Sequence, residues 1–461
     1  MNGLLRQAIV GTLRTRSRIA CAGQCANMTS IAVFPPSSFI DDTVSVVVSG
    51  LAPNTRVSLR SSVQDRDKVF QAVGHFEADG DGKVDLNAQQ SLGGSYTGLE
   101  PMGLFWSLGP APGQKRGIRF AKQDVTEPVE FTFAVYNEHL ELPLLITAQP
   151  LAVTQTRRWY MKESEVDRIK IHSGKIRGIL YKPKGPGPFP AVIDMFGLAG
   201  GVIEYRAAML ASKGIIALAL PYFSYEDLPR SFHHLEFEYF EEATAWLSSQ
   251  SFVSPNATGI VGTSFGGSIA LEMAARLPQI KAVVATSCLP FFKTLLTYRG
   301  ERTPSSHPPV DPEKGYMSKE GFAMKEMFTE DVCNLPDEEL IDMQNSEARF
   351  LFVLGEDDQN VPAAEGARRT VQKMQSHNKT NYELLSYKGA GHLLEPPFQP
   401  AGRGIYNAPL DHVLDFGGEM KAHAHACQDV WSKTLSFLRR HLMTTEGDGH
   451  QLTSSSRISK L

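Results

Sequence analysis

A short turn between two regular segments constrains this chain more than any other feature. Residues 262–267 read Gly-Thr-Ser-Phe-Gly-Gly and so contain the pattern Gly-x-Ser-x-Gly centred on Ser264. The preceding residues 258–261 have the composition of a short buried strand, and residues 268–277 carry apolar side chains at helical spacing up to Pro278. A serine on so tight a turn from a strand into a helix is exposed at the end of a sheet, which makes Ser264 a candidate nucleophile.

The pattern is weak evidence when it is taken alone. A chain that contains 39 glycines shows it by chance with a probability of roughly one in five, and the alternative is a simple glycine turn before a helix. A nucleophilic serine also needs an acid and a base, which follow it in the order Ser, Asp or Glu, His. Candidates for both partners are present.

The candidate acid follows an apolar strand. Residues 350–354 read Phe-Leu-Phe-Val-Leu and run into a glycine turn that carries three carboxylates. Asp358 lies three residues after Gly355, which is the usual offset of the acid at the end of such a strand. We therefore prefer Asp358 to Asp357, with Glu356 as a third candidate.

The candidate base is His392. Residues 382–387 form another strand-like run, and the sequence Lys-Gly-Ala-Gly leads from this run to His392. The chain has 13 histidines, and most histidines in proteins are solvated or structural. His392 differs from the others because it lies in a glycine-flanked loop after the acid strand. We expect it to take the proton of Ser264, and Asp358 to hold the tautomer of its imidazole.

Attack of a serine on an acyl carbon produces an oxyanion that needs preorganised N–H donors. One donor is expected from the backbone of Phe265, the residue after the nucleophile. The second is expected from the loop that follows an earlier strand. Residues 190–201 form an apolar strand that opens into a glycine-rich loop. We place the second donor among Met195, Phe196 and Gly197.

Strand and helix patterns alternate in the second part of the chain. Examples are the strands expected at residues 215–220 and 281–286 and the helices expected at 235–247 and 429–442. This alternation predicts a mainly parallel sheet with helices on both faces. Together with the serine turn it predicts an α/β-hydrolase catalytic domain at residues 157–443. Residues 157–173 are expected to lead into it.

The first part of the chain has a different pattern. Short alternating runs separated by turn residues predict an all-β, immunoglobulin-like sandwich at residues 29–156. The runs cover residues 43–49, 56–63, 70–76, 83–86 and 131–136.

One loop of this first part, Asp79-Gly-Asp-Gly, resembles the start of a calcium loop. Its twelfth position is Gln90 rather than Glu, so we expect a hairpin turn there. No metal or cofactor is expected elsewhere in the chain.

Two terminal segments have the composition of targeting signals. Residues 1–28 contain four arginines, no acidic residue, and apolar residues at roughly helical spacing, which predicts a mitochondrial presequence; the alternative is a disordered basic tail. The polar tail 444–461 ends in Ser459, Lys460 and Leu461, a signal read by the peroxisomal import receptor. Initiation at Met28 would give a peroxisomal form, and initiation at Met1 a mitochondrial one.

Composition excludes several classes of protein. The formal net charge is −4, and no basic stripe is interleaved with aromatic residues, which argues against a nucleic-acid partner. No run of about eighteen apolar residues is present, so no membrane span is predicted. The five cysteines show no metal-ligand or redox spacing, which favours reduced thiols in an intracellular compartment.

Four further segments have distinctive sequences. They read Gly-Gly-Ser-Tyr-Thr-Gly-Leu-Glu-Pro-Met-Gly at 93–103, Gly-Pro-Gly-Pro-Phe-Pro at 185–190, Glu-Asp-Leu-Pro at 226–229 and Gly-Ala-Gly-His-Leu-Leu-Glu-Pro-Pro at 389–397. Through them the chain resembles the acyl-CoA thioesterase and bile acid-CoA:amino acid N-acyltransferase family, from about residue 32 to about residue 442.

The resemblance implies a fatty acyl-CoA substrate and a catalytic triad at Ser264, Asp358 and His392. It also implies that members with a cysteine nucleophile transfer the acyl group to glycine or taurine, whereas members with a serine hydrolyse it. With Ser264, the chain is predicted to be an acyl-CoA thioesterase that releases free fatty acid and CoA. The alternatives are an N-acyltransferase, a general carboxylesterase or serine peptidase, and a non-catalytic acyl-CoA binder.

Overall fold

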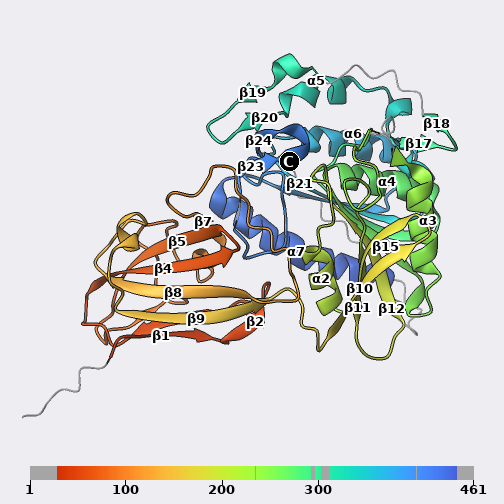
Figure 1. The fold of residues 1–461 in the computed structure, drawn as a ribbon. Helices are drawn as coiled ribbons and strands as arrows, with labels where there is room; N and C mark the ends of the chain where they lie inside the picture. The colour runs from red at the N-terminus through yellow and green to blue at the C-terminus, as the bar shows by residue number, and fades with distance from the viewer. Residues whose placement is uncertain (1–27, 234, 292–295, 303–310, 401, 444–461) are drawn as a thin grey trace, which may run out of the picture.

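The computed structural model describes residues 28–233, 235–291, 296–302, 311–400 and 402–443. The predicted presequence, apart from Met28, and the predicted C-terminal signal lie outside these residues. The described chain forms an N-terminal domain of β-strands and a larger domain of strands and helices (Figure 1).

The N-terminal domain contains two sheets, as the alternating sequence runs predict. The three-stranded sheet consists of β1 (Ser30–Phe34), β3 (Ser45–Ser49) and β6 (Val84–Asp85) in the order β1-β3-β6. The six-stranded sheet has the order β2-β9-β8-β4-β5-β7. Its strands are β2 (Ser37–Phe39), β4 (Arg56–Asp65), β5 (Lys68–Glu77), β7 (Gly109–Pro110), β8 (Val129–Asn137) and β9 (Ala152–Trp159). A short helix, α1 (Gly103–Trp106), is buried against β4 and β5.

The passage between the two domains is shorter than the sequence suggests. β9 pairs with β8 through Arg158, so the expected boundary between residues 156 and 157 falls inside a strand. Residues from Val166 onward already belong to the sheet of the second domain. We propose that the domains divide between Trp159 and Val166.

The second domain is built on an eight-stranded sheet of order β10-β11-β13-β12-β15-β16-β21-β22. Strands β13 through β22 run parallel, and β10 and β11 are antiparallel additions at one edge. The strands are β10 (Val166–Ser173), β11 (Ile176–Pro183), β12 (Phe189–Met195), β13 (Ile216–Ala219), β15 (Val253–Thr263), β16 (Ile280–Thr286), β21 (Arg349–Gly355) and β22 (Tyr382–Tyr387).

Helices cover both faces of this sheet, as predicted (Figure 1). Alternate strand residues point to opposite faces, so Val192 and Val261 pack in the core with α2 and α7, whereas Ile193 and Ile260 pack with α3 and α4. The helices are α2 (Tyr205–Ser212), α3 (Phe237–Ser248), α4 (Phe265–Arg276), α6 (Ala363–Ser376) and α7 (Met420–Leu442).

Helix α7 begins nine residues earlier than its amphipathic pattern suggests. The carboxylate of Glu419 accepts hydrogen bonds from the N–H groups of Lys421 and Ala422, which caps the helix directly after two glycines. The first turns of α7 therefore lie within reach of the loop that carries His392, and they enter the description of the site below.

Smaller elements extend the second domain beyond the edges of the main sheet. A four-stranded sheet has the order β19-β20-β24-β23, and a three-stranded one the order β14-β17-β18. Their strands are β14 (Leu235–Glu236), β17 (Leu296–Tyr298), β18 (Glu301–Arg302), β19 (Tyr316–Met317), β20 (Phe322–Ala323), β23 (Gly404–Asn407) and β24 (His412–Asp415), and helix α5 (Glu326–Asn334) lies between β20 and β21 in sequence. Five short 3-10 helices complete the described residues, at Leu144–Ile146, Pro312–Lys314, Asp337–Glu339, Met343–Asn345 and Ala408–Leu410.

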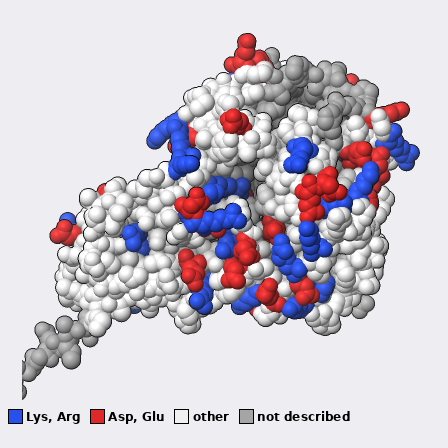
Figure 2. All heavy atoms as spheres, viewed as in Figure 1, with Lys and Arg blue, Asp and Glu red and all other residues white. Residues whose placement is uncertain are grey.

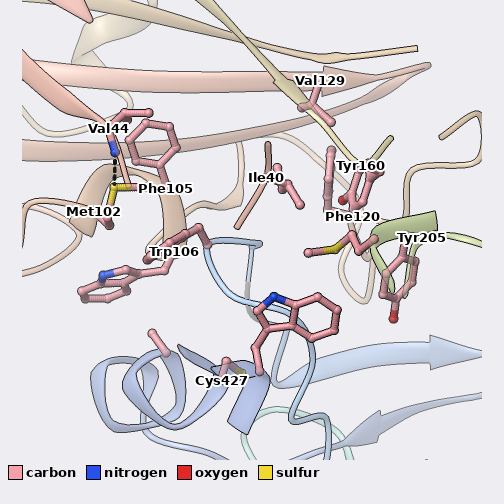
Figure 3. Close-up of a cluster of buried hydrophobic side chains, with 14 of the residues drawn as sticks. Ile40, Val44, Met102, Phe105, Trp106, Phe120, Val129, Tyr160, Tyr205 and Cys427 are labelled. Atoms are coloured by element: carbon pink, nitrogen blue, oxygen red, sulfur yellow. Dashed lines mark hydrogen bonds between the residues drawn. The ribbon is translucent and has the colours of Figure 1, made fainter. Parts of the chain in front are cut away.

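The two domains share one hydrophobic core. Figure 3 shows Trp106 of the N-terminal domain and Cys427 of α7 in the same cluster of buried side chains. At the edge of this cluster the indole N–H of Trp431 donates to the Asp41 carboxylate over 2.9 Å, and Lys213 pairs with Asp41 over 2.8 Å. Burial of this apolar surface fixes how the domains are placed relative to each other. Among the described helices, none is both long and apolar enough to cross a bilayer.

Candidate active site

Ser264 lies on the turn between β15 and α4 in a strained backbone conformation. Its φ and ψ angles are 58° and −129°, a region that residues other than glycine rarely adopt. The N–H of Ser264 donates to the carbonyl of Thr286 in the neighbouring strand over 2.8 Å, and its own carbonyl accepts from Gly267 over 2.9 Å. These bonds hold the strain, which is a feature often found at functional sites.

The glycines of the pattern are required by close packing. A Cβ atom on Gly262 would lie 2.5 Å from the carbonyl oxygen of Gly266. A Cβ atom on Gly266 would in turn lie 2.5 Å from the carbonyl oxygen of Phe196. The sequence pattern around Ser264 thus results from a turn that leaves no room for a side chain at position 262 or 266.

His392 and Asp358 come together as the sequence predicts. His392 follows β22, and Asp358 follows β21. The Nδ1 atom of His392 lies 2.7 Å from Oδ2 of Asp358. Both side chains are almost completely buried. The second oxygen of Asp358 accepts the N–H groups of Asn360 and Val361 over 2.8 and 3.0 Å. The carboxylate is therefore held in place, and Nε2 of His392 remains as the ring nitrogen that can accept a proton.

The two other carboxylates of this turn have different partners. Asp357 accepts the N–H of Gly418 over 2.9 Å and the side-chain amide of Gln359 over 2.9 Å. Glu356 is exposed and accepts the hydroxyl of Ser386 over 2.7 Å. Of the three candidate acids, Asp358 is the one that contacts His392.

The expected oxyanion loop lies directly against the serine. A Cβ atom on Gly197 would lie 2.7 Å from Cβ of Ser264 and 3.0 Å from its hydroxyl oxygen. The carbonyl of Met195 accepts from Arg206 over 3.0 Å, and that of Phe196 accepts from the hydroxyl of Tyr222 over 2.5 Å. Because a carbonyl and the N–H that follows it point in opposite directions, these bonds fix the N–H groups of Phe196 and Gly197.

Arg206 joins the oxyanion loop to the serine strand and was not among the predicted residues. Its guanidinium donates to Asp194 and to the hydroxyl of Thr263, each over 2.6 Å, and it lies 4.1 Å from the centre of the Phe196 ring. Burial raises the pKa of Asp194, and the neighbouring Arg206 opposes that rise. The one signal in the sequence is an arginine among the apolar residues of α2.

His423 supports the loop of His392 and was also missed. Its Nδ1 accepts the N–H of Gly391, and its Nε2 donates to the carbonyl of Leu393, each over 3.0 Å. Both residues flank His392. Burial lowers the pKa of His423, so the ring is neutral and can accept on one side and donate on the other.

Ser264 and His392 line the same cavity, whose volume is about 720 Å³. Most of its wall is apolar and comes from the second domain, including Leu289, Phe328 and Phe416. The segment after β7 in the N-terminal domain supplies another part of the wall. Within the described residues no group of three or more His, Cys, Asp or Glu is arranged to hold a metal ion.

A link between the domains lies next to this cavity. Arg119 of the N-terminal domain pairs with Glu395, three residues after His392, and donates to the hydroxyl of Tyr205 over 3.0 Å. The hydroxyl of Tyr205 also donates to Glu395. The ring of Tyr205 lies 5.4 Å from that of Phe196. This cluster connects the oxyanion loop, the histidine loop and the N-terminal domain.

A serine on a strained strand-to-helix turn, in the same cavity as a histidine that is paired with a carboxylate at the ends of parallel strands, defines an α/β-hydrolase. The N-terminal region of the acyl-CoA thioester hydrolase/BAAT family matches residues 41–173, and the C-terminal region of that family matches residues 235–444. The chain belongs to this family, which confirms the resemblance seen in the sequence.

Curated relatives match almost the whole chain. It is 36% identical over 425 residues to acyl-coenzyme A thioesterase 1 of Homo sapiens, covering 91% of this chain and 96% of the relative. It is also 36% identical over 425 residues to the mitochondrial acyl-coenzyme A thioesterase 2 of Homo sapiens, covering 91% and 84%. Bile acid-CoA:amino acid N-acyltransferase of Mus musculus is 35% identical over 421 residues, covering 90% and 98%. The relatives thus include both thioesterases and acyltransferases.

Solved structures with similar folds are more distant in sequence. A puromycin-hydrolysing peptidase of Mycobacterium tuberculosis is 13% identical, covers 89% of this chain and 67% of its own, and has a TM-score of 0.42. The esterase Pf2001 of Pyrococcus furiosus is 13% identical, covers 60% and 93%, and has a TM-score of 0.38.

Proposed function

We propose that this protein is a serine-dependent acyl-CoA thioesterase that hydrolyses fatty acyl-CoA to free fatty acid and CoA. The observation that carries the proposal is Ser264 on its strained turn, lining the same cavity as the buried His392–Asp358 pair. The membership of the family supports an acyl-CoA substrate, and the apolar wall of the cavity suits an acyl chain.

The first half of the reaction acylates the serine. Nε2 of His392 takes the proton of Ser264 as its hydroxyl oxygen attacks the thioester carbon, while Asp358 stabilises the imidazolium. The backbone N–H of Phe265 and one from Met195, Phe196 or Gly197 would bind the oxyanion. The C–S bond then breaks, CoA leaves as its thiolate, and the proton held by His392 passes to that sulfur, so the imidazole is neutral again for the second half. A thiol has a pKa of about 8.5, so its thiolate leaves readily and needs little help from an acid.

Water completes the cycle. His392 takes a proton from a water molecule, whose oxygen attacks the acyl carbon of the seryl ester. The resulting intermediate breaks the bond to Ser264, the serine oxygen recovers a proton from His392, and the fatty acid is released. An oxygen ester reacts less readily with amines than a thioester does, so Ser264 favours water over glycine or taurine as the acceptor.

The test is thiol release from acyl-CoAs of increasing chain length, with and without glycine or taurine, for the wild type and Ser264→Ala. We expect the substitution to lower kcat by at least about four orders of magnitude. Mass spectrometry should find free acid as the main product of the wild type. Near-normal turnover by Ser264→Ala would refute the serine mechanism. A dominant acyl-amino acid product would favour the acyltransferase, and turnover of simple esters alone would favour a general carboxylesterase.

Two localisation signals are part of the proposal. Residues 1–28 would direct a mitochondrial form, and Ser459, Lys460 and Leu461 would bind the peroxisomal import receptor. One relative is named as a mitochondrial thioesterase. Imaging of internally tagged forms that start at Met1 or Met28 tests both signals. Identical peroxisomal staining would contradict the mitochondrial one.

A further inference from the structure

The cavity of Ser264 is lined by charged residues of one sign. Lys68, Lys115, Arg116 and Arg119 contribute to its wall, and the described residues that line it include no Asp or Glu. The chain as a whole carries 50 acidic and 46 basic residues, so its composition does not produce this excess of cations. A concave site with cations alone attracts an anionic ligand.

All four cations come from the N-terminal domain, whereas Ser264 and His392 come from the catalytic domain. Lys68 begins β5, and the other three lie in the segment of residues 111–119 that follows β7. Figure 2 shows Lys and Arg side chains gathered at the upper end of the junction between the two domains. The cavity is therefore a composite, with its cations on one domain and its reacting groups on the other.

The segment 111–119 is fixed against the catalytic domain. The carbonyl of Gly117 accepts the N–H of Tyr406 in β23 over 2.9 Å, and Arg116 donates to the carbonyl of Lys319. Gly117 has a φ of 80°, and a Cβ atom there would lie 2.9 Å from a methyl group of Val413 in β24. A side chain at this position would push the segment away from the cavity, so the cations are held at the site by the backbone.

Three of the four cations have no acidic partner among the residues that the structure describes. Arg119 pairs with Glu395. For Lys68, Lys115 and Arg116, by contrast, no carboxylate of the described chain lies within 4.0 Å. Lys115 and Arg116 are exposed, and Lys68 is partly buried. Neighbouring cations repel one another, and a bound phosphate would remove that repulsion and form charge-assisted hydrogen bonds with them.

We propose that Lys68, Lys115 and Arg116 form the binding site for the phosphate groups of CoA. The inference rests on the proposed function and extends it, because it gives the N-terminal domain a direct part in substrate binding. The phosphates are joined to the thioester through the flexible pantetheine arm. They can therefore contact one domain while the thioester reaches Ser264 on the other and the acyl chain lies along the apolar wall.

The test compares two thioesters of the same fatty acid, one with CoA and one with N-acetylcysteamine, which lacks phosphates. In K68A/K115A/R116A, the ratio of kcat/KM for the CoA thioester to kcat/KM for the truncated thioester should fall at least tenfold. Arg56→Ala is the matched control, because Arg56 is an exposed cation of the same domain outside the cavity wall. An unchanged ratio in the triple variant would overturn the inference while leaving the thioesterase function intact.

Calorimetric binding of free CoA gives a readout that does not depend on catalysis. The triple variant should bind CoA at least tenfold more weakly than the wild type and Arg56→Ala, and the difference should shrink as salt screens the charges. Equal affinity would again overturn the inference. If the wild type released no thiol from either thioester, the proposed function would be wrong. The CoA affinities would still show whether these cations bind the phosphate groups. If the triple variant does not fold, K115A/R116A can be used in its place, because both side chains are exposed and their removal should not disturb folding.

Discussion

His392 and Asp358 form a buried pair, with Nδ1 of the histidine 2.7 Å from the carboxylate, although 34 residues separate them in sequence. They meet because β21 and β22 are parallel neighbours, so the loops at their carboxyl ends lie at the same edge of the sheet. The carboxylate is held by two backbone N–H groups before any substrate arrives. The carboxylate therefore orients the imidazole of His392 whether or not a substrate is bound.

Asp358→Asn should lower kcat by about four orders of magnitude, because an amide in this position favours the wrong tautomer of the imidazole. Asp357→Asn and Glu356→Gln are matched controls, since both remove a neighbouring carboxylate that does not contact His392. Thiol-release assays on the three purified variants make the comparison. A loss in Asp357→Asn as large as that in Asp358→Asn would contradict the assignment of the acid.

The choice of nucleophile should decide the acceptor. Ser264→Cys should raise the ratio of N-acyl glycine or N-acyl taurine to free acid, since the acyl-enzyme becomes a thioester that is more reactive toward amines. The native Cys288 at the cavity does not compete, because burial raises the pKa of its thiol to about 12. Mass spectrometry of the products at saturating amine measures the ratio. The same ratio in variant and wild type would show that the acceptor is set elsewhere in the site.

The candidate triad could be picked out from the sequence because its signals are local. The turn at Ser264 needs glycines on both sides for steric reasons, and the loops of Asp358 and His392 each follow a strand-like run through a glycine. β22 has the bounds that its sequence run suggests. In each case a few adjacent residues both form the local structure and determine it.

The supporting residues could not be predicted because their partners are distant in sequence. Arg206 contacts Thr263 across 57 residues, and His423 contacts Gly391 across 32. The cations of the segment 111–119 reach the cavity only because the two domains share a core. No periodicity or motif in the sequence indicates such contacts. They can be identified only once the order of the strands and the packing of the two domains are known.

His423 should make the protein less stable in mild acid. The pKa of His423 is below its ordinary value of 6.5 in the folded protein, chiefly because of burial, although the Leu393 carbonyl, Glu395 and Asp357 oppose the shift. The unfolded chain therefore binds a proton more readily than the folded protein does. The contribution of His423 to the free energy of unfolding is fully present above pH 6.5, and it is lost as the pH falls from 6.5 toward the folded-state pKa. The slope from this group is at most about 1.4 kcal/mol per pH unit.

Urea unfolding at pH 5.5, 6.5 and 7.5 measures this dependence. His423→Gln keeps a donor and an acceptor but does not titrate, so it should flatten the loss of stability between pH 6.5 and 5.5. His172→Gln is the control, since His172 is exposed. A wild type and a His423→Gln variant with the same pH slope would show that other groups cause the loss.

Arg206 should act as a positioning residue for the oxyanion loop. Lysine at this position keeps the charge beside Asp194 but cannot contact Thr263 and the Met195 carbonyl at the same time, because it lacks the planar fork of arginine. Arg206→Lys should therefore lower kcat about tenfold with little change in KM. Thr263→Val, which removes one acceptor, should give a smaller loss of kcat. A purely structural role would lower the urea midpoint of Arg206→Lys and leave the kcat of the folded enzyme unchanged.

The pair of Arg119 and Glu395 should stabilise the contact between the domains. Burial would lower the pKa of Arg119, but Glu395 and Tyr205 outweigh that effect and raise it, so the guanidinium stays charged. Arg119→Met leaves Glu395 without its cation, and we expect it to lower the free energy of unfolding by about 2–3 kcal/mol. This is less than for a fully enclosed pair, because about a fifth of the Arg119 side chain is exposed.

The double variant R119M/E395Q separates the pair from its surroundings. Removal of both charges leaves no buried ion without a partner, so the double variant should be less destabilised than the sum of Arg119→Met and Glu395→Gln. Urea unfolding of the four proteins gives the coupling energy, and thiol release from the same samples reports on the histidine loop. Additive losses would mean that Arg119 and Glu395 act independently. The connection from the N-terminal domain to His392 would then run through the shared apolar core, since Tyr205 and Trp431 are both buried there.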